Sequence, residues 1–416
     1  MPTNYAHGLE NRIRFTFYTS RVLPIHQCLL SRRDLRNKQK IMSSCSADVR
    51  NEHPQKRNSI FSFFSGAGFL DLGFEHAGFD VVFANEIHRP FAEAYVHARK
   101  ALNLQLPENG VSVTSIDHYL TGEPLAELQS RVRAEGEKGA LVGFIGGPPC
   151  PDFSVGGKNR GHEGDNGRLS KSYIDLICLC QPDFFVFENV KGLWRTARHR
   201  AFFEQLKLSL DEAGYALTEK LINSIEYGAP QDRDRIILFG VLKKHVSQSL
   251  SITFPWEAHV RYSNYEVRKL PWPKTGTVDL SDSELPRELT VSYWFEKNQV
   301  ENHPNSLHAF TPRAGLAKFL TIEEGDDSRK SYKRLHRHRF SPTVAYGNNE
   351  VHIHPTLPRR LSVAEALSLQ SLPKEFELPA TMTLSNMFKT VGNGVPYLAA
   401  LGLAKTVSDF LANSSK

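Results

Sequence analysis

One cysteine stands in the segment GGPPCPDFS, residues 146–154, at a position that could support nucleophilic chemistry. Pro148 and Pro149 fix their own φ angles at about −65° and donate no backbone hydrogen bond. Cys150 is therefore expected on a stiff loop rather than inside a helix or strand. Most free cysteines are inert side chains of a core, but a thiol on such a loop becomes a nucleophile when a neighbouring group supports the reaction.

A glycine-rich turn and a carboxylate suggest a ligand site. Gly66 and Gly68 in FFSGAGFLDLGF, residues 63–74, follow an apolar run and let the backbone turn tightly and approach a ligand. The third glycine of the dinucleotide pattern is missing, because Asp71 takes its place. Glu86 ends the next apolar run, twenty residues after Gly66, where a carboxylate accepts hydrogen bonds from ribose. The pattern predicts a ligand that contains ribose but not pyrophosphate, which fits S-adenosylmethionine.

Two further segments place charged side chains at the ends of apolar runs. Glu188 closes the run FFVFEN, residues 184–189, and QDRDR, residues 231–235, begins the run RIILFGV. Glu188 is a candidate proton donor, and Arg233 and Arg235 are candidate partners for it or for a substrate. The alternatives are a carboxylate that caps the following loop and ordinary ion pairs of the arginines with the neighbouring acids.

The elements that must position these residues alternate along the chain. Apolar runs predict strands, and stretches between several of them have helical periodicity. This alternation favours an α/β fold of the Rossmann-like kind, with a mostly parallel twisted sheet and helices on both faces. We therefore expect Gly66, Glu86, Cys150 and Glu188 near one edge of the sheet. The strands are expected at 60–64, 79–86, 141–147, 184–189 and 235–241, and the helices at 89–100, 170–180 and 200–214.

Composition and charge bound the class of protein. The chain has 416 residues, of which 40% are hydrophobic and 23% charged, as in a globular protein of two domains. No apolar run has the length of a membrane span, and five cysteines without metal-site spacing favour a reducing, cytoplasmic location and no metal. The net charge is +6, but residues 1–57 hold 11 Lys/Arg and 4 Asp/Glu, so the remainder carries −1.

The alternation also predicts the domain organisation. Residues 1–57 are a basic extension that we expect to be disordered, and 58–245 form the α/β domain. Residues 246–345 are rich in Trp, Tyr and Pro without clear periodicity, which indicates a second, irregular domain. It contains the run 328–339 with six Lys/Arg, a candidate for contact with nucleic acid or simply a solvated face. Residues 346–416 return to helices, including a capping box of Ser362 and Glu365.

Taken together, the motifs resemble those of one family. GGPPCPDFS, FENVKGL, QDRDRIILFG and VGNGVP, in this order behind FFSGAG, are similar to the motif set of the DNA (cytosine-5-)-methyltransferases, of the bacterial modification-methylase type. The resemblance covers residues 59–412 except 245–345, which in that family is the variable target-recognition domain. It implies methyl transfer from S-adenosylmethionine to C5 of a cytosine flipped out of double-stranded DNA.

The resemblance and the chemistry agree on catalytic roles. Cytosine C5 is a poor nucleophile until a thiolate adds at C6, which assigns that addition to Cys150. Glu188 would protonate or hydrogen-bond N3 and so must carry or share a proton at that moment. By carry-over from the family, Arg235 would reach O2 of the base and support Glu188, and Arg233 would brace the loop that holds the cysteine.

The resemblance also implies two sets of binding residues. In the methyl-donor set, Ile87 replaces a frequent aromatic residue, and Ser115 stands where an aspartate often binds adenine, with Asp117 as the alternative. The DNA set combines Ser154, in the loop after Cys150, and Gln231, in QDRDR, with cations of the 328–339 run, which are included for their charge and not for the resemblance. The methyl-donor set is Phe64, Ser65, Gly66, Gly68, Leu70, Glu86, Ile87, Ser115, Ile116, Pro148, Leu169, Asn393 and Val395; the DNA set is Ser154, Gln231, Arg329, Lys330, Lys333 and Arg334.

Other functions stay open on the same scaffold. One is a transfer-RNA cytosine methyltransferase, although no cysteine follows Cys180 to supply that subgroup's Cys-Phe-Thr signature. A silent DNA-binding relative and a dinucleotide-dependent dehydrogenase are further alternatives. We expect a monomer that modifies host DNA in a restriction-modification system, alongside an endonuclease it need not contact, and a solitary methyltransferase is the alternative.

Overall fold

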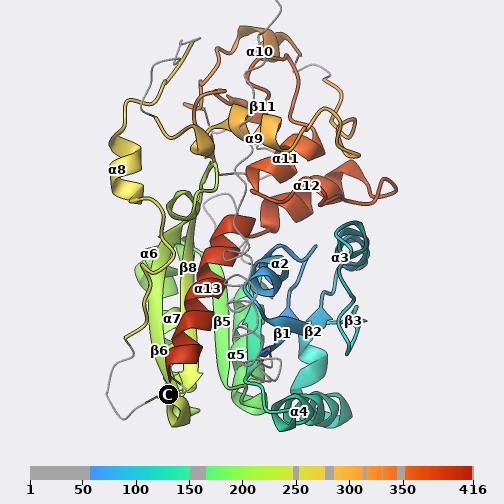
Figure 1. The fold of residues 1–416 in the computed structure, drawn as a ribbon, viewed down its shortest axis with the longest axis vertical. Coiled ribbons are helices and arrows are strands. Elements are labelled where there is room, and N and C mark those ends of the chain that lie inside the picture. The colour runs from blue at the N-terminus through green and yellow to red at the C-terminus, as the bar shows by residue number, and fades with distance from the viewer. Residues whose placement is uncertain are drawn as a thin grey trace, which may run out of the picture. The chain divides into compact units, whose positions relative to one another are not determined.

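A seven-stranded sheet forms the centre of the structure, a computed structural model that describes residues 57–149, 165–246, 253–276, 285–312, 316–329, 331–343 and 352–414. The strand order is β3-β2-β1-β4-β5-β8-β6. Five neighbouring strands are parallel, which confirms the α/β fold with a mostly parallel sheet (Figure 1). Their bounds are β1 Ser59–Phe63, β2 Asp80–Asn85, β3 Val111–Ser112, β4 Val142–Gly146, β5 Phe184–Val190, β6 Tyr215–Asn223 and β8 Asp234–Leu242.

One strand of this sheet runs against the others, and its direction matters for the site. β8 pairs antiparallel with both β5 and β6, so that Arg235 lies opposite Val190, and Asp234 lies opposite Asn223. The start of β8 therefore meets the carboxyl ends of β5 and β6. β6 was not predicted from the sequence, because YALTEKLIN carries polar residues at its centre.

Helices cover both faces of the sheet, as expected for strands buried on two sides. Phe61 and Phe185 contribute to the core on the face of α4, α5 and α7, while Ile60 and Phe184, their chain neighbours, contribute to the core beneath α2 and α13. Successive strand residues point to opposite faces, so each apolar run fills both cores. These helices span α2 Phe69–His76, α4 Gly122–Glu137, α5 Asp165–Cys180, α7 Ala197–Glu212 and α13 Tyr397–Ser414.

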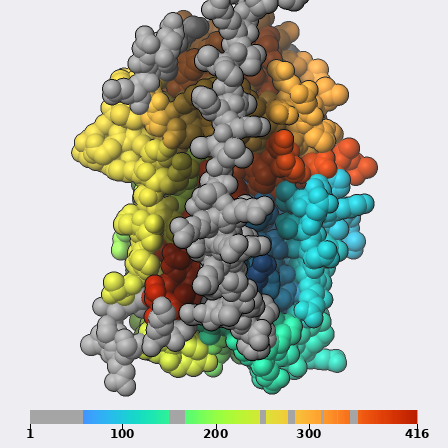
Figure 2. Space-filling view, in the orientation of Figure 1, coloured from blue at the N-terminus to red at the C-terminus, as the bar shows by residue number. Residues whose placement is uncertain are grey.

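The segment from residue 253 to 343 has short elements around small cores of its own. Val267, Trp272, Leu289 and Phe340 pack together with Ile225, which precedes the QDRDR segment. Figure 1 shows these elements at the end of the sheet where α11 and α12 also lie, and Figure 2 shows the same segment in yellow and orange on the molecular surface. The helices here are α8 Asn264–Lys269, α9 Val291–Lys297 and α10 Leu316–Thr321; the short strands are β9 Lys333–Arg334, β10 Ser341–Pro342 and β11 His352–Ile353.

The C-terminal residues return the chain to the sheet. Ser362 and Glu365 form the predicted capping box, with Glu365 Oε2 accepting from the Ser362 N–H at 2.8 Å. This box begins α11 Val363–Leu369, which is followed by α12 Leu384–Asn393 and then by α13 beside α2 (Figure 1). Together with α3 Arg89–Ala101, α11 and α12 enclose a third core. This core packs residues that follow β1 against residues from the C-terminal part of the chain.

Candidate active site

Glu188 and Arg235 form a buried ion pair where β5 ends and β8 begins. Arg235 Nε lies 2.7 Å from Glu188 Oε1, and the two side chains are only 12% and 9% exposed. A second guanidinium N–H donates to the Asp234 carbonyl at 2.8 Å and fixes the orientation of the group. The antiparallel direction of β8 produces this contact, since it brings the first residues of one strand to the last residues of the other.

Gly147 brings the same carboxylate against the loop that leads to Cys150. A Cβ at Gly147 would lie 2.5 Å from Glu188 Oε2, so only glycine leaves room for the carboxylate there. The adjacent Asn189 amide reaches toward the Pro148 carbonyl at 3.5 Å, and Pro148 is buried. Glu188 therefore faces the beginning of the GGPPC segment. Cys150 and Ser154 themselves lie outside the described residues.

QDRDR places its alternate side chains on two sides of the chain. Arg233 is buried and donates from Nη2 to the carbonyl of Gly392 at 2.8 Å, in the VGNG motif at the end of α12. Gln231 is also fully buried and donates to the Leu369 carbonyl at 3.1 Å. This burial corrects the expectation that Gln231 contacts DNA: the residue connects the QDRDR segment to α11 and has no surface to present.

The two acids of QDRDR belong to a separate polar network. Asn223 donates to Asp232 and to Asp234 at 2.8 Å each, and Lys191 Nζ lies 2.7 Å from Asp234. Burial alone would raise the pKa of Asp234, but the bonds from Lys191 and Asn223 outweigh it and hold this pKa below its usual value. Arg268 of α8 pairs with Asp232 at 2.5 Å and so ties the 253–343 segment to the QDRDR segment, which leads into β8. The alternating charges in the sequence are the signal for this network.

The glycine turn after β1 closes onto Glu86, at the end of β2. The Gly66 N–H donates to Glu86 Oε2 at 3.0 Å, and the His88 N–H donates to Oε1 at 2.8 Å. Burial raises the pKa of Glu86, and the two backbone donors oppose that shift. Phe64 and Gly66 both have a positive φ, 55° and 56°, a conformation that costs energy for phenylalanine and marks the turn as constrained.

A buried brace supports this turn from behind, and the sequence analysis did not identify it. Asp71 accepts hydrogen bonds from Ser62 at 2.7 Å and from Tyr95 at 2.9 Å. The Tyr95 ring lies against Gly68, where a Cβ would meet it at 2.8 Å. Burial raises the pKa of Asp71 to about 6. The sequence does contain a signal for this brace, because Asp71 is an acid on the apolar side of a helix, in the place of the missing third glycine.

The remaining residues of the predicted donor set differ in exposure. Ile87 is 63% exposed beside Glu86, so an aliphatic surface is available to a ligand, whereas Ile116 is buried. Ser115 donates to Asp117, which also accepts from Ser172 at 2.6 Å and pairs with Arg168. Although burial opposes it, the bonds from Arg168, Ser172 and Ser115 hold the pKa of Asp117 below its usual value. Ser65, Leu70 and Val395 are buried, Phe64 and Leu169 are half-buried, and Asn393 is exposed.

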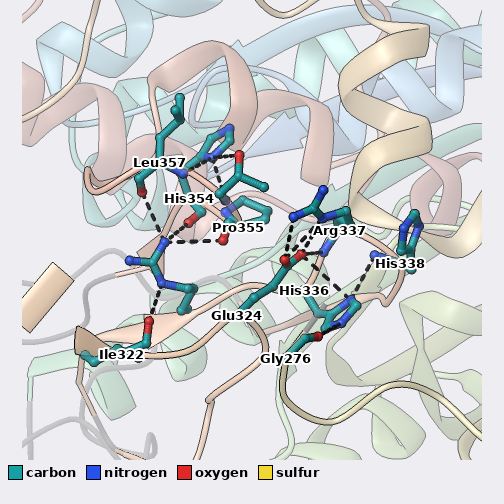
Figure 3. Close-up of polar contacts among 11 residues, drawn as sticks. Gly276, Ile322, Glu324, His336, Arg337, His338, His354, Pro355 and Leu357 are labelled. Atoms are coloured by element: carbon teal, nitrogen blue, oxygen red, sulfur yellow. Dashed lines mark hydrogen bonds and ion pairs between the residues drawn. The ribbon is translucent and has the colours of Figure 1, made fainter. Parts of the chain in front are cut away.

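The cations at 328–339 divide into exposed and internal side chains. Arg329 is exposed and Lys333 is half-buried, while Lys330 lies outside the described residues. Arg334 is buried instead, with its guanidinium donating to Ile322 O at 2.7 Å and His354 O at 2.9 Å. Figure 3 shows the carbonyls of Ile322, His354, Pro355 and Leu357 converging on this guanidinium. Arg334 is therefore a structural side chain, and its burial corrects the expectation that it contacts DNA.

Replacing Arg334 with alanine is expected to destabilise the protein by at least about 3 kcal/mol, because several buried carbonyls lose a charged donor and each unsatisfied carbonyl costs about 1–3 kcal/mol. Urea unfolding followed by tryptophan fluorescence measures this change. Arg329→Ala removes an exposed cation from the same run and should alter stability by less than about 0.5 kcal/mol. Equal stability of the two variants would contradict the internal role of Arg334.

Comparison with known proteins identifies the class first by fold. The structure matches a solved putative DNA modification methyltransferase encoded within a prophage, from E. coli, with a TM-score of 0.57, 21% identity and coverage of 85% of this chain and 99% of that one. It also matches the solved Dnmt2 methyltransferase of S. pombe with a TM-score of 0.54 at 14% identity, over 86% of this chain and 99% of that one. The fold is thus one that solved methyltransferases share.

The sequence comparisons then identify the family. The sequence model of the C-5 cytosine-specific DNA methylases matches residues 58–409. Type II methyltransferase M.NmeDI of Neisseria meningitidis serogroup C is 58% identical over 89% of this chain and 88% of its own, and M.FnuDI of Fusobacterium nucleatum is 29% identical over 86% and 96%. The chain belongs to the C-5 cytosine-specific DNA methylase family and is a DNA (cytosine-5-)-methyltransferase.

The described residues also bear on membrane spans and metal sites. No helix in the described part of the chain combines the length and the apolar character that crossing a membrane requires. Within the same residues, no group of three or more His, Cys, Asp or Glu side chains is arranged to hold a metal ion.

Proposed function

We propose that this methyltransferase transfers a methyl group from S-adenosylmethionine to C5 of a cytosine flipped out of a specific double-stranded DNA sequence, through transient addition of the Cys150 thiolate to C6. The observation that carries the proposal is the buried Glu188–Arg235 pair, 2.7 Å apart, facing the glycine that begins the cysteine loop. A carboxyl held at that point can serve N3 of a base while the neighbouring thiolate serves C6.

The residues of the predicted donor site fit S-adenosylmethionine. Glu86 is held by the Gly66 and His88 N–H groups, and each carboxylate oxygen keeps lone pairs for ribose hydroxyls. Exposed Ile87 offers an apolar surface to adenine, and Asp117, beside Ser115, is the acceptor near its amino group. The bound donor supplies an electrophilic methyl group. The chain supplies the orientation of that methyl group toward the flipped base.

The proposed reaction conserves atoms and charge through side chains of this chain. The Cys150 sulfur bonds to C6, and Glu188 shares its proton with N3, so that C5 gains enamine character. C5 then takes the methyl group from S-adenosylmethionine as the sulfur–methyl bond breaks, and S-adenosylhomocysteine leaves as a neutral thioether. Arg235 holds the Glu188 carboxyl, and Arg233 anchors the segment to Gly392. The contact of Arg235 with O2 of the base is part of the proposal. A base then removes the C5 proton, the bond to sulfur breaks, and 5-methylcytosine is released with the thiolate restored.

Affinity for S-adenosylmethionine is expected to fall as the pH drops. Burial raises the pKa of Glu86, and only the ionised carboxylate accepts freely from two ribose hydroxyls; the affinity is therefore full above that raised pKa and is lost below it. Glu86→Gln should weaken binding about 10–100-fold at neutral pH, the effect of a charge-assisted hydrogen bond, and remove the pH dependence. Calorimetric titration of both proteins between pH 5 and 8 measures this, and a parallel decline in the variant would contradict it.

The decisive experiment traps the covalent adduct. Conversion sequencing of DNA from cells that express the chain first gives the methylated sequence. A duplex with 5-fluorocytosine at that position cannot lose its C5 substituent, so the wild-type protein should remain bound through residue 150, detectable by mass spectrometry of the peptide. Cys150→Ala should bind the same duplex without an adduct. A wild-type protein that methylates DNA but forms no adduct would overturn the proposed mechanism.

The biological role follows from the relatives. M.NmeDI and M.FnuDI are named Type II methyltransferases, which supports modification of host DNA in a restriction-modification system. We further propose a bacterial cytoplasmic location, residues 246–345 as the target-recognition domain, and a chain that acts as a monomer. A neighbouring endonuclease gene whose product is blocked by this methylation tests the role, and its absence would favour a solitary methyltransferase. Labelled methyl transfer to duplex DNA and to transfer RNA, compared side by side, tests the substrate.

A further inference from the structure

A polar cavity lies between residues 268–275 and the turn 325–328. Its volume is about 470 Å³, and its lining includes Asp232, so the cavity adjoins the QDRDR segment, which contains the candidate catalytic arginines. Trp272 and Phe340 are buried on its apolar side and meet edge to face, with ring centroids 5.3 Å apart. These aromatic rings give the cavity a firm wall, and the polar side chains stand above them.

The charges in the cavity are balanced, which distinguishes it from a phosphate site. Its lining contains three cations, Arg268, Lys274 and Arg339, and three acids, Asp232, Asp326 and Asp327. Arg268 is engaged by Asp232, and Asp326 accepts from the N–H and hydroxyl of Ser328 within the turn. A site for the DNA backbone would carry an excess of positive charge; this one offers donors and acceptors together.

Arg339 and Asp327 are a pair of opposite charge with hydrogen-bonding capacity to spare. Arg339 Nη1 lies 3.9 Å from Asp327 Oδ2, close enough for attraction but beyond hydrogen-bond distance. Their side chains are 27% and 41% exposed. The guanidinium therefore keeps donors, and the carboxylate keeps acceptors, that can turn toward a ligand in the cavity.

The turn 325–328, which carries Asp327, is held in place by hydrogen bonds around Glu324. Glu324 accepts from Arg337 Nε at 2.9 Å and Nη2 at 2.8 Å, and His336 bonds to the Gly276 carbonyl at 2.9 Å (Figure 3). The Gly276 N–H donates in return to the Glu324 carbonyl at 2.9 Å, which joins the two walls of the cavity. Arg334 is hydrogen-bonded to backbone carbonyls behind the same turn. The turn and its side chains are therefore pre-organised, as a specific binding site requires.

We infer that this cavity reads the major-groove edge of one G·C pair in the recognition sequence, with Arg339 and Asp327 as specificity-determining residues. Arginine donates two hydrogen bonds to guanine O6 and N7, and aspartate accepts one from cytosine N4, so the pair of side chains matches the two halves of one base pair. The inference rests on the proposed function, because it requires DNA bound at this edge of the protein.

Methylation of a duplex library with randomised flanking bases tests the inference. In Arg339→Gln, the preference for G·C at one position should fall about 10–100-fold while the other positions keep theirs, and Asp327→Asn, which preserves shape, should relax the same position. Arg287→Gln is the matched control, since Arg287 is an exposed cation that pairs with Glu296 outside the cavity; its sequence preference should equal that of wild type.

The outcomes separate the two proposals. An unchanged sequence preference in both Arg339→Gln and Asp327→Asn, or a uniform loss of methylation at every sequence, would overturn the base-reading role even if wild type methylates a defined site. If wild type shows no sequence-specific cytosine methylation in this library, the proposed function itself fails. Thermal melting of each variant shows whether a loss of activity reflects unfolding, and Asp327→Asn carries the test if Arg339→Gln melts early.

Discussion

Glu188→Gln is expected to lower kcat for DNA methylation about 10²–10⁴-fold, the range that one positioned proton donor or acceptor supplies. The amide has nearly the shape of the carboxyl but cannot pass a proton to N3, and it leaves Arg235 without its charged partner at 2.7 Å. Single-turnover methylation of a duplex that contains the recognised sequence measures the chemical step without product release.

Binding should change far less than chemistry in this variant. The Kd for duplex DNA should stay within a few-fold of wild type, because Glu188 is buried and its role is at the extruded base. Glu127→Gln removes an exposed carboxylate of α4 that pairs only with Arg131 among the described contacts, and serves as the control with wild-type kcat. If Glu188→Gln retained more than about a tenth of wild-type kcat, the assignment of the N3 proton to this residue would be untenable.

The part of the site that parallel strands build could be predicted from the sequence. Gly66, Glu86 and Glu188 follow or end strands that run in one direction, so their meeting needs only the rule that such strands share a carboxyl edge. The contact of Arg235 with Glu188 needs more, because it depends on β8 running backwards. A strand buried on both faces is a continuous apolar run in either direction, so its sequence carries no sign of that reversal.

Charged side chains were the least predictable part for a related reason. Arg329 and Arg334 lie in one cationic run, yet one is exposed and the other is buried among carbonyls. Arg334 is stabilised by backbone oxygens of residues 319–322 and 354–357. No pattern within 328–339 indicates that these oxygens will lie nearby. The same holds for Arg268, whose partner Asp232 is 36 residues away in the sequence.

Gly147→Ala is expected to reduce kcat by at least about 10²-fold, because its Cβ would occupy a point 2.5 Å from Glu188 Oε2. Gly147 does not have a positive φ, so alanine can adopt its backbone conformation, and the carboxylate must move instead. A movement of about 1 Å takes Glu188 away from Arg235 and from the position proposed for N3. Single-turnover methylation should therefore slow while the melting temperature changes little.

Two glycines of the same chain make this prediction specific. At Gly136, in α4, a Cβ meets nothing within 4 Å, so Gly136→Ala should keep full activity and gain about 0.5–1 kcal/mol of stability. At Gly143, on β4, a Cβ would meet the Phe184 ring at 2.2 Å, and overpacking should lower stability by about 1–3 kcal/mol without a selective effect on the chemical step. Of these three variants, only Gly147→Ala should lose methylation rate while remaining folded. If it methylates as fast as Gly136→Ala, the Glu188 carboxylate does not depend on the space left by Gly147. Glu188 is then not positioned by the loop that leads to Cys150.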